Sequence, residues 1–160
     1  MAAGRLPEAI SHYEHATRLK PALGSAQRNL AFALVQSGRM AEALPHFEQA
    51  VQASPRIASA HIDLGAALSA LNRWPEAATS FARAVEIQPD WAEAHQKLAL
   101  ALANTDRMAE ALRELETALR LEPNSAETHS YLAQVLRALG REREAAEHLS
   151  RAATLQGAPR

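Results

Sequence analysis

Apolar residues recur along the chain with helical spacing, in short segments that turn residues separate. In residues 40–53, for example, Ala43, Phe47 and Ala50 fall on one face of a helix. This spacing is typical of amphipathic helices that bury one stripe of side chains. The sequence therefore predicts an all-α chain of about nine helices. They are expected at residues 5–19, 23–36, 40–53, 57–70, 74–87, 91–104, 108–121, 125–138 and 142–155.

The apolar stripes repeat with a period of 34 residues. Several columns keep this phase along the chain, which indicates stacked structural repeats that share a continuous core. The columns include Ala9, Ala43, Ala77, Ala111 and Ala145; Ala16, Ala50, Ala84, Ala118 and Ala152; Leu30, Leu64, Leu98 and Leu132; and Pro21, Pro55, Pro89 and Pro123.

Turn residues divide each repeat into two helices. Gly38, Asn72, Asp106 and Gly140 occupy this turn, and Gly4 takes the same place near the start. Gly, Asn and Asp best tolerate the left-handed backbone that often ends a helix. We expect one continuous array: a partial repeat at 1–22 that supplies only a second helix, then full repeats at 23–56, 57–90, 91–124 and 125–157.

Composition narrows the possible functions. The net charge is −1, which does not favour a nucleic-acid binder that works by neutralising phosphates. The absence of cysteine excludes thiolate catalysis and Cys-ligated zinc. We find no nucleotide-binding, zinc-protease or serine-hydrolase motif, so neither an enzyme nor a cofactor is expected. No spanning apolar run or signal peptide is visible, and we expect a cytoplasmic protein without membrane contact.

The repeat resembles the tetratricopeptide repeat, a helix-turn-helix unit of 34 residues. The family's Ala-x3-Phe block is present at Ala43-x3-Phe47 and at Ala77-x3-Phe81. The family's closing proline matches the proline column, and its Leu matches the column that begins with Leu30. The resemblance covers nearly the whole chain.

The resemblance implies an α-solenoid of antiparallel helix pairs, wound as a right-handed superhelix. The first helices of such an array line a concave groove, where family members bind peptide segments or helices of partner proteins. Carrying the groove positions onto this chain gives the candidate partner-binding residues Arg28, Asn29, Phe32, Ile62, Asp63, Gln96, Lys97, Leu100, Tyr131 and Gln134.

Three histidines share one column: His61, His95 and His129. Stacked helices lie about 8–10 Å apart, whereas the ligands of one zinc ion lie about 2 Å from the metal. One column therefore cannot build one metal site. We expect these imidazoles to pack between helices or to lie at the surface.

Three functions remain open. The first is a non-enzymatic module that binds a protein or peptide partner in the groove. The second is a structural scaffold that self-associates through its uncapped ends. The third is a substrate-recruiting array cut from a larger enzyme such as a glycosyltransferase.

One residue conflicts with its predicted helix. Pro45 lies inside the predicted helix 40–53, where it removes one backbone hydrogen bond and favours a kink.

Overall fold

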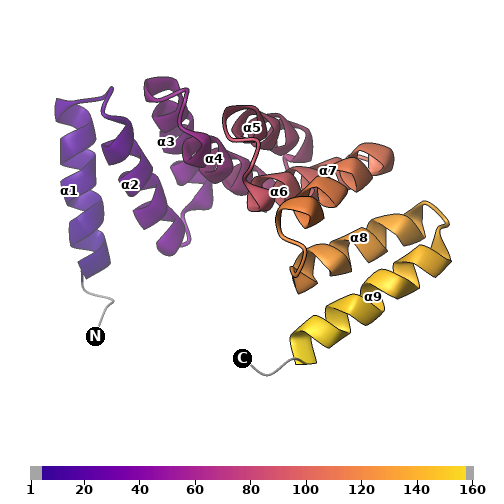
Figure 1. Cartoon of the computed structure of the whole chain (residues 1–160). Coiled ribbons are helices and arrows are strands. Elements are labelled where there is room, and N and C mark those ends of the chain that lie inside the picture. Colours follow the sequence, from indigo (N-terminus) through magenta and orange to yellow (C-terminus); the bar gives the residue numbers. More distant parts are fainter. Residues whose placement is uncertain (1–4, 158–160) are drawn as a thin grey trace. The chain divides into compact units, whose positions relative to one another are not determined.

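The computed structural model describes residues 5–157, and this part of the chain is built from α-helices alone. Each helix agrees with its expected range to within two residues at either end, so the predicted all-α fold is confirmed. The helices are α1 (Arg5–Leu19), α2 (Gly24–Gln36), α3 (Met40–Ala53), α4 (Ala58–Ala70), α5 (Trp74–Ile87), α6 (Ala92–Ala103), α7 (Met108–Leu121), α8 (Ala126–Ala138) and α9 (Glu142–Gly157) (Figure 1).

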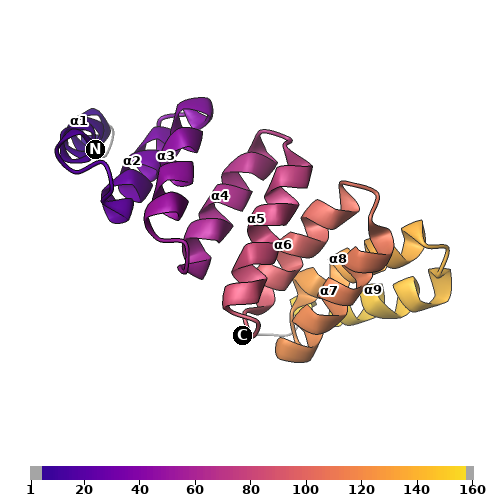
Figure 2. The same cartoon turned by 90° about the horizontal axis from the view of Figure 1, so that it is seen from above.

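The chain divides into two compact units, Met1–Ile87 and Gln88–Arg160. In the first unit, α2 pairs with α3 and α4 pairs with α5, while α1 packs on α2 and α3 packs on α4. In the second unit, α6 pairs with α7, α8 pairs with α9, and α7 packs on α8. Figure 2 shows each of these pairs as a helical hairpin. That the repeats form one continuous array stays a prediction.

Alanine lies where the two helices of a pair come together. Ala43, Ala77, Ala111 and Ala145 are each 0% exposed. A methyl side chain lets two helix backbones approach closely, and the larger side chains beside it then fill the remaining space. A second 34-residue column places bulky side chains beside these alanines, and its members Phe47, Phe81 and Leu115 are all at most 3% exposed.

The turns between paired helices adopt the expected left-handed backbone. The φ angles are 78° at Gly38, 58° at Asn72, 59° at Asp106 and 75° at Gly140. In the first of these turns the N–H of Arg39 donates to the carbonyl of Leu34 across 2.9 Å, a bond that closes the helix end. The turn chemistry predicted from sequence is therefore confirmed at all four positions; Gly4 lies outside the described residues.

Gly65 of α4 allows an unusually close approach of the Phe81 ring. A Cβ added at residue 65 would lie 2.5 Å from Phe81 Cε1. In the second unit the equivalent residues are Ala99 and Leu115, and both are buried. The first full repeat instead combines Ala31 with Phe47, so the clash at residue 65 belongs to the particular placement of the Phe81 ring.

We expect Gly65→Ala to destabilise the protein by about 1–3 kcal/mol, because the new methyl group displaces the Phe81 ring. Thermal unfolding by circular dichroism measures the loss. Gly157→Ala is the matched control, since nothing lies within 4 Å of a Cβ at that residue. The double change Gly65→Ala with Phe81→Leu reproduces the second unit's pair, and it should recover part of the loss. A neutral Gly65→Ala would show that the ring moves aside freely.

Pro45 lies within α3, as predicted, and is exposed. Its nitrogen has no proton to donate to the carbonyl of Ala41, so α3 lacks one internal hydrogen bond. The penalty of proline in a helix is about 3 kcal/mol, and part of it is offset because proline also restricts the unfolded chain.

We expect Pro45→Ala to stabilise the protein by about 1–2 kcal/mol, which corresponds to a rise in Tm of roughly 3–6 °C. Arg113→Ala, at the equivalent exposed place in α7, should change Tm by about 1 °C or less. An unchanged or lower Tm for Pro45→Ala would contradict the expectation.

Candidate functional site

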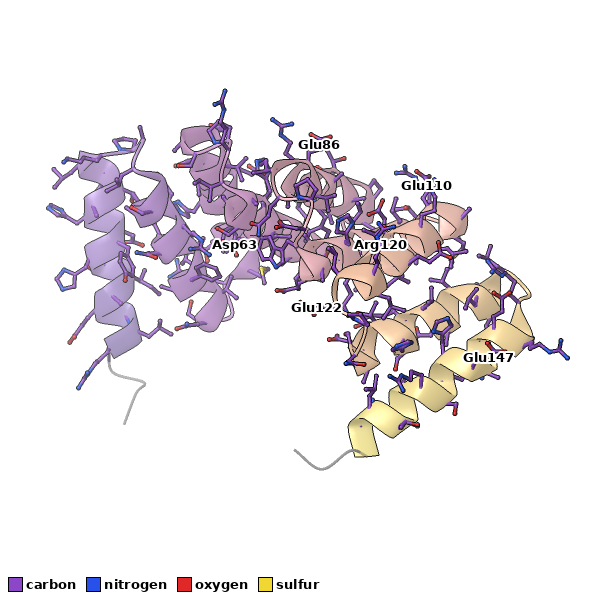
Figure 3. All side chains as sticks on the ribbon, in the orientation of Figure 1. Asp63, Glu86, Glu110, Arg120, Glu122 and Glu147 are labelled. Atoms are coloured by element: carbon purple, nitrogen blue, oxygen red, sulfur yellow. The ribbon has the colours of Figure 1, made fainter. Side chains whose placement is uncertain are left out.

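The exposed face of α2 and α4 carries an ion pair between two predicted groove residues. The Nε of Arg28 on α2 donates to the carboxylate of Asp63 on α4. Figure 3 labels Asp63 among the side chains of the chain. The Asp63 side chain is only 13% exposed, and the Arg28 guanidinium also lies 5.1 Å from the centre of the Phe32 ring. This distance is typical of a cation–π contact. The two charges therefore join neighbouring first helices and neutralise each other.

A small hollow lies beside this ion pair. The Phe32 ring meets the Phe47 ring edge to face, with centroids 5.3 Å apart, and fills part of the space between the helices. About 120 Å³ remains open. The lining residues are Phe32, Val35, Met40, Phe47, Asp63, Ala66 and Ala67.

On the corresponding face of the second unit, the polar side chains bond to residues of their own helix. The Nζ of Lys97 lies 3.2 Å from Glu93 Oε1, and the Tyr131 hydroxyl donates to Glu127 Oε1 across 3.1 Å. Burial, and then the contact with Glu127, raises the pKa of the Tyr131 phenol above its ordinary value. The Nε2 of Gln96 is buried and has no hydrogen-bond partner within the described chain. Unlike the Arg28–Asp63 pair, these contacts do not join two helices.

The second unit has a larger hollow, of about 190 Å³. Its lining residues are Ala99, Leu100, Ala103, Asn104, Met108, Leu115, Tyr131, Gln134, Val135 and Ala138. Each of the seven residues that line the first hollow has its equivalent here, two repeats later in sequence. Leu100 and Leu115 replace Phe32 and Phe47, and the loss of two aromatic rings leaves more open volume.

The structure brings together six of the ten predicted partner-binding residues, three in each unit. Arg28, Phe32 and Asp63 meet in the first unit, and Leu100, Tyr131 and Gln134 line the hollow of the second.

The other four predicted residues lie apart from these two groups. Asn29 is exposed and lines neither hollow, while Ile62 is 7% exposed and belongs to the core. Gln96 and Lys97 lie on α6, and neither lines the hollow of the second unit.

Sequence reasoning missed the contribution of the second helices to both hollows. Met40 and Met108 begin α3 and α7, and each lines the hollow of its unit. The sequence contained a signal for both methionines, because they belong to one column of mostly bulky residues that recurs every 34 residues. The groove positions were counted on first helices alone, so this column was left out.

The histidine column is buried and bonded to the chain just before each first helix. His61, His95 and His129 are at most 8% exposed. In each ring Nε2 lies between 2.9 and 3.2 Å from the carbonyl oxygen of the proline six residues earlier. Gln27 makes the same bond through its side-chain amide. Within residues 5–157, no three His, Asp or Glu side chains cluster in a way that could hold a metal ion.

The other end of three of these side chains, those of Gln27, His95 and His129, meets the second helix of the same pair, 19 residues later. Gln27 Oε1 lies 2.7 Å from His46 Nδ1, His95 Nδ1 lies 2.7 Å from Glu114 Oε2, and His129 Nδ1 lies 2.8 Å from His148 Nδ1. We call this arrangement the clasp: a first-helix side chain that bonds a proline carbonyl at one end and a second-helix side chain at the other. Sequence reasoning missed the clasp because it compared residues within columns only.

The comparisons with known proteins agree with this architecture. One tetratricopeptide repeat profile matches residues 34–101 and 105–157, and a second matches residues 1–56. Among curated proteins none matches the chain.

None of the helices in the described residues is long and apolar enough to cross a membrane.

Several solved structures share the fold. A crystal structure of MamA has a TM-score of 0.89 at 19% identity, over 96% of this chain and 90% of MamA. MamA residues 41-end from Desulfovibrio magneticus RS-1 gives 0.88 at 21% identity, over 96% and 87%. YrrB, described as a tetratricopeptide repeat protein with an unusual peptide-binding site, gives 0.87 at 24% identity, over 97% and 80%. With its helix pairs, left-handed turns and alanine columns in a 34-residue period, the chain belongs to the tetratricopeptide repeat proteins.

Proposed function

We propose that the chain is a non-enzymatic protein-interaction module whose second unit takes an apolar side chain of a partner peptide or helix into the hollow between α6, α7 and α8. The observation that carries this proposal is the hollow itself, which is lined mainly by apolar groups, the exposed Leu100 among them. Leu100 is 39% exposed although it lies on a first helix beside a cavity. An exposed apolar side chain at the mouth of a cavity is typical of an anchor point in a protein interface.

The size of the hollow supports this kind of occupant. Its volume of about 190 Å³ exceeds the roughly 150 Å³ of an engineered apolar cavity that binds benzene. A phenyl ring or a branched aliphatic side chain therefore fits it. In the first unit the Phe32 ring already fills much of the equivalent space, so we infer that the second unit supplies the stronger anchor.

Polar groups around the hollow supply the means for specificity. Tyr131, Gln134 and Asn104 line it together with the apolar residues, and amide and hydroxyl groups of this kind can hydrogen-bond a peptide backbone. YrrB, which is similar in fold, is described as having a peptide-binding site. Binding of an extended or helical segment across this face is consistent with both observations.

The test uses peptides selected from a random library on the full chain, with Kd measured by calorimetry. Selected peptides should share one large apolar residue. Leu100→Glu places a charge at the mouth of the hollow, and we expect it to weaken binding at least about tenfold, as truncation of an interface anchor does.

Leu121→Glu provides the matched control, because Leu121 is a comparably exposed leucine (37%) that does not line the hollow. Its Kd should stay within about twofold of the original, as expected of a surface residue outside the interface. Equal binding by the Leu100→Glu chain would show that the partner docks elsewhere.

A second candidate function is self-association through α1. In α1 the apolar stripe Ala9, Tyr13 and Ala16 is half-exposed, whereas the equivalent residues of α3, Ala43, Phe47 and Ala50, are at most 3% exposed. Within the described chain, α1 contacts α2 but has no paired first helix over this stripe. We propose that a second copy of the chain covers the stripe.

Light scattering coupled to size-exclusion chromatography, run over a wide concentration range, tests this candidate. The mass should rise towards that of a dimer, and Tyr13→Arg should return it to that of a monomer by placing a charge in the apolar contact. Ser11→Arg adds the same charge at an exposed position of α1 and should leave the dimer intact. A strict monomer at every concentration would rule out self-association.

A further inference from the structure

The clasp has a different chemistry in α8 and α9 from that in the other pairs. In α6 and α7 the two ends of His95 face a carbonyl and a carboxylate, which are both acceptors, so the protonated ring satisfies both bonds. In α2 and α3 the amide of Gln27 faces one imidazole, that of His46. In α8 and α9 two imidazoles face each other, His129 and His148.

The two Nδ1 atoms of His129 and His148 lie head-on. They are 2.8 Å apart, and the ring centroids are 5.1 Å apart. The centroid separation exceeds the nitrogen separation by about two ring radii, so both nitrogens lie close to the line between the centroids. This alignment suits an N–H···N hydrogen bond. It does not suit one shared metal ion, whose ligands must converge on it from different directions.

The number of protons on the pair decides whether this bond exists. His129 Nε2 keeps its proton, because it donates to the carbonyl of Pro123 across 3.2 Å. When both rings are neutral, His148 Nδ1 donates to His129 Nδ1. One added proton binds Nε2 of His148, and the proton that already lies between the two Nδ1 atoms then forms a charge-assisted bond. A second added proton puts a hydrogen on both, and the bond is replaced by repulsion between two cations.

The groups around His148 have opposing effects on the pKa of its imidazole. Burial, and then the positive charge of His129, lowers the pKa of the His148 imidazole below its ordinary value of 6.5. Glu116 from α7 and the α9 residues Glu144 and Glu147 oppose this shift. Arg141 bonds Glu144 across 2.6 Å, which neutralises part of that opposition.

The sign of the pH effect follows from the lowered pKa. The unfolded chain takes up a proton at this imidazole at higher pH than the folded chain does. The stability that it contributes is therefore complete above about pH 6.5 and is lost as pH falls through the pKa of the folded state.

We propose that His129 and His148 form an acid-sensitive clasp that holds α8 against α9 at neutral pH and releases it when both rings become protonated. The proposal does not rest on the proposed function, since neither histidine lines the hollow between α6, α7 and α8. Acidification would loosen one helix pair while the other pairs, which have no two imidazoles facing each other, remain closed.

Hydrogen exchange of backbone amides on the full chain tests the proposal, because it reports local opening of each helix pair separately. Protection factors, which correct for the pH dependence of the chemical exchange rate, are compared between about pH 7 and pH 5. We expect the opening constant of α8 and α9 to rise about tenfold for each pH unit over which one extra proton is taken up. The opening constant of α6 and α7 should change much less.

Two variants replace the His129–His148 pair with the residue pairs found in the other two clasps. His129→Gln reproduces the Gln27–His46 pair, in which the imidazole can take up its proton at Nε2 without losing the shared bond. His148→Glu reproduces the His95–Glu114 pair, in which a carboxylate accepts a hydrogen bond from the ring and no second imidazole is present. Both variants keep a bond between α8 and α9, and in both the protection of these helices should become nearly independent of pH in this range.

Each outcome bears on the proposal. Acid-dependent opening of α8 and α9 that disappears in both variants supports it. Should the original chain show no greater acid opening in α8 and α9 than in α6 and α7, the clasp is not acid-sensitive. If both variants open with acid as the original does, another group is responsible and the proposal is wrong.

Discussion

The close approach of two helices within each pair is the constraint on which the rest of the structure depends. Ala43, Ala77, Ala111 and Ala145 are completely buried at these contacts, and any larger side chain would force the helices apart. With the backbones held close together, Phe47, Phe81 and Leu115 of the neighbouring column pack in the core between them. Gly65 shows how little free space remains between the helices, because the Phe81 ring occupies the place that a methyl group at residue 65 would need.

The same backbone carries two different surfaces. Equivalent residues line the hollow in each unit, so the repeat determines where a hollow forms. The side chains at those positions determine what it can accept: Phe32 and Phe47 fill the hollow of the first unit, and Leu100 and Leu115 leave that of the second open. This division between a shared framework and variable lining is the physical basis on which one fold serves many partners.

The clasp shows that equivalent positions of different repeats can carry side chains of different charge at a contact between two helices. The residue six positions after each proline bonds the proline carbonyl, which lies just before the first helix. The opposite end of the side chain meets an imidazole at His46, a carboxylate at Glu114 and a second imidazole at His148. In these three helix pairs, one residue on the second helix therefore sets the chemistry of the contact.

The sequence by itself determined the helices, their turns, their pairing within a repeat and the family. These features follow from spacing along one chain, because helical periodicity and left-handed turn residues are local properties. Only the tertiary structure decided that Arg28 bonds Asp63, that Ile62 is buried while Leu100 is exposed, and that His129 meets His148. Each of these contacts joins residues from different helices, and the distance between helices depends on the packing of every side chain between them. A column of residues 34 apart cannot report that distance.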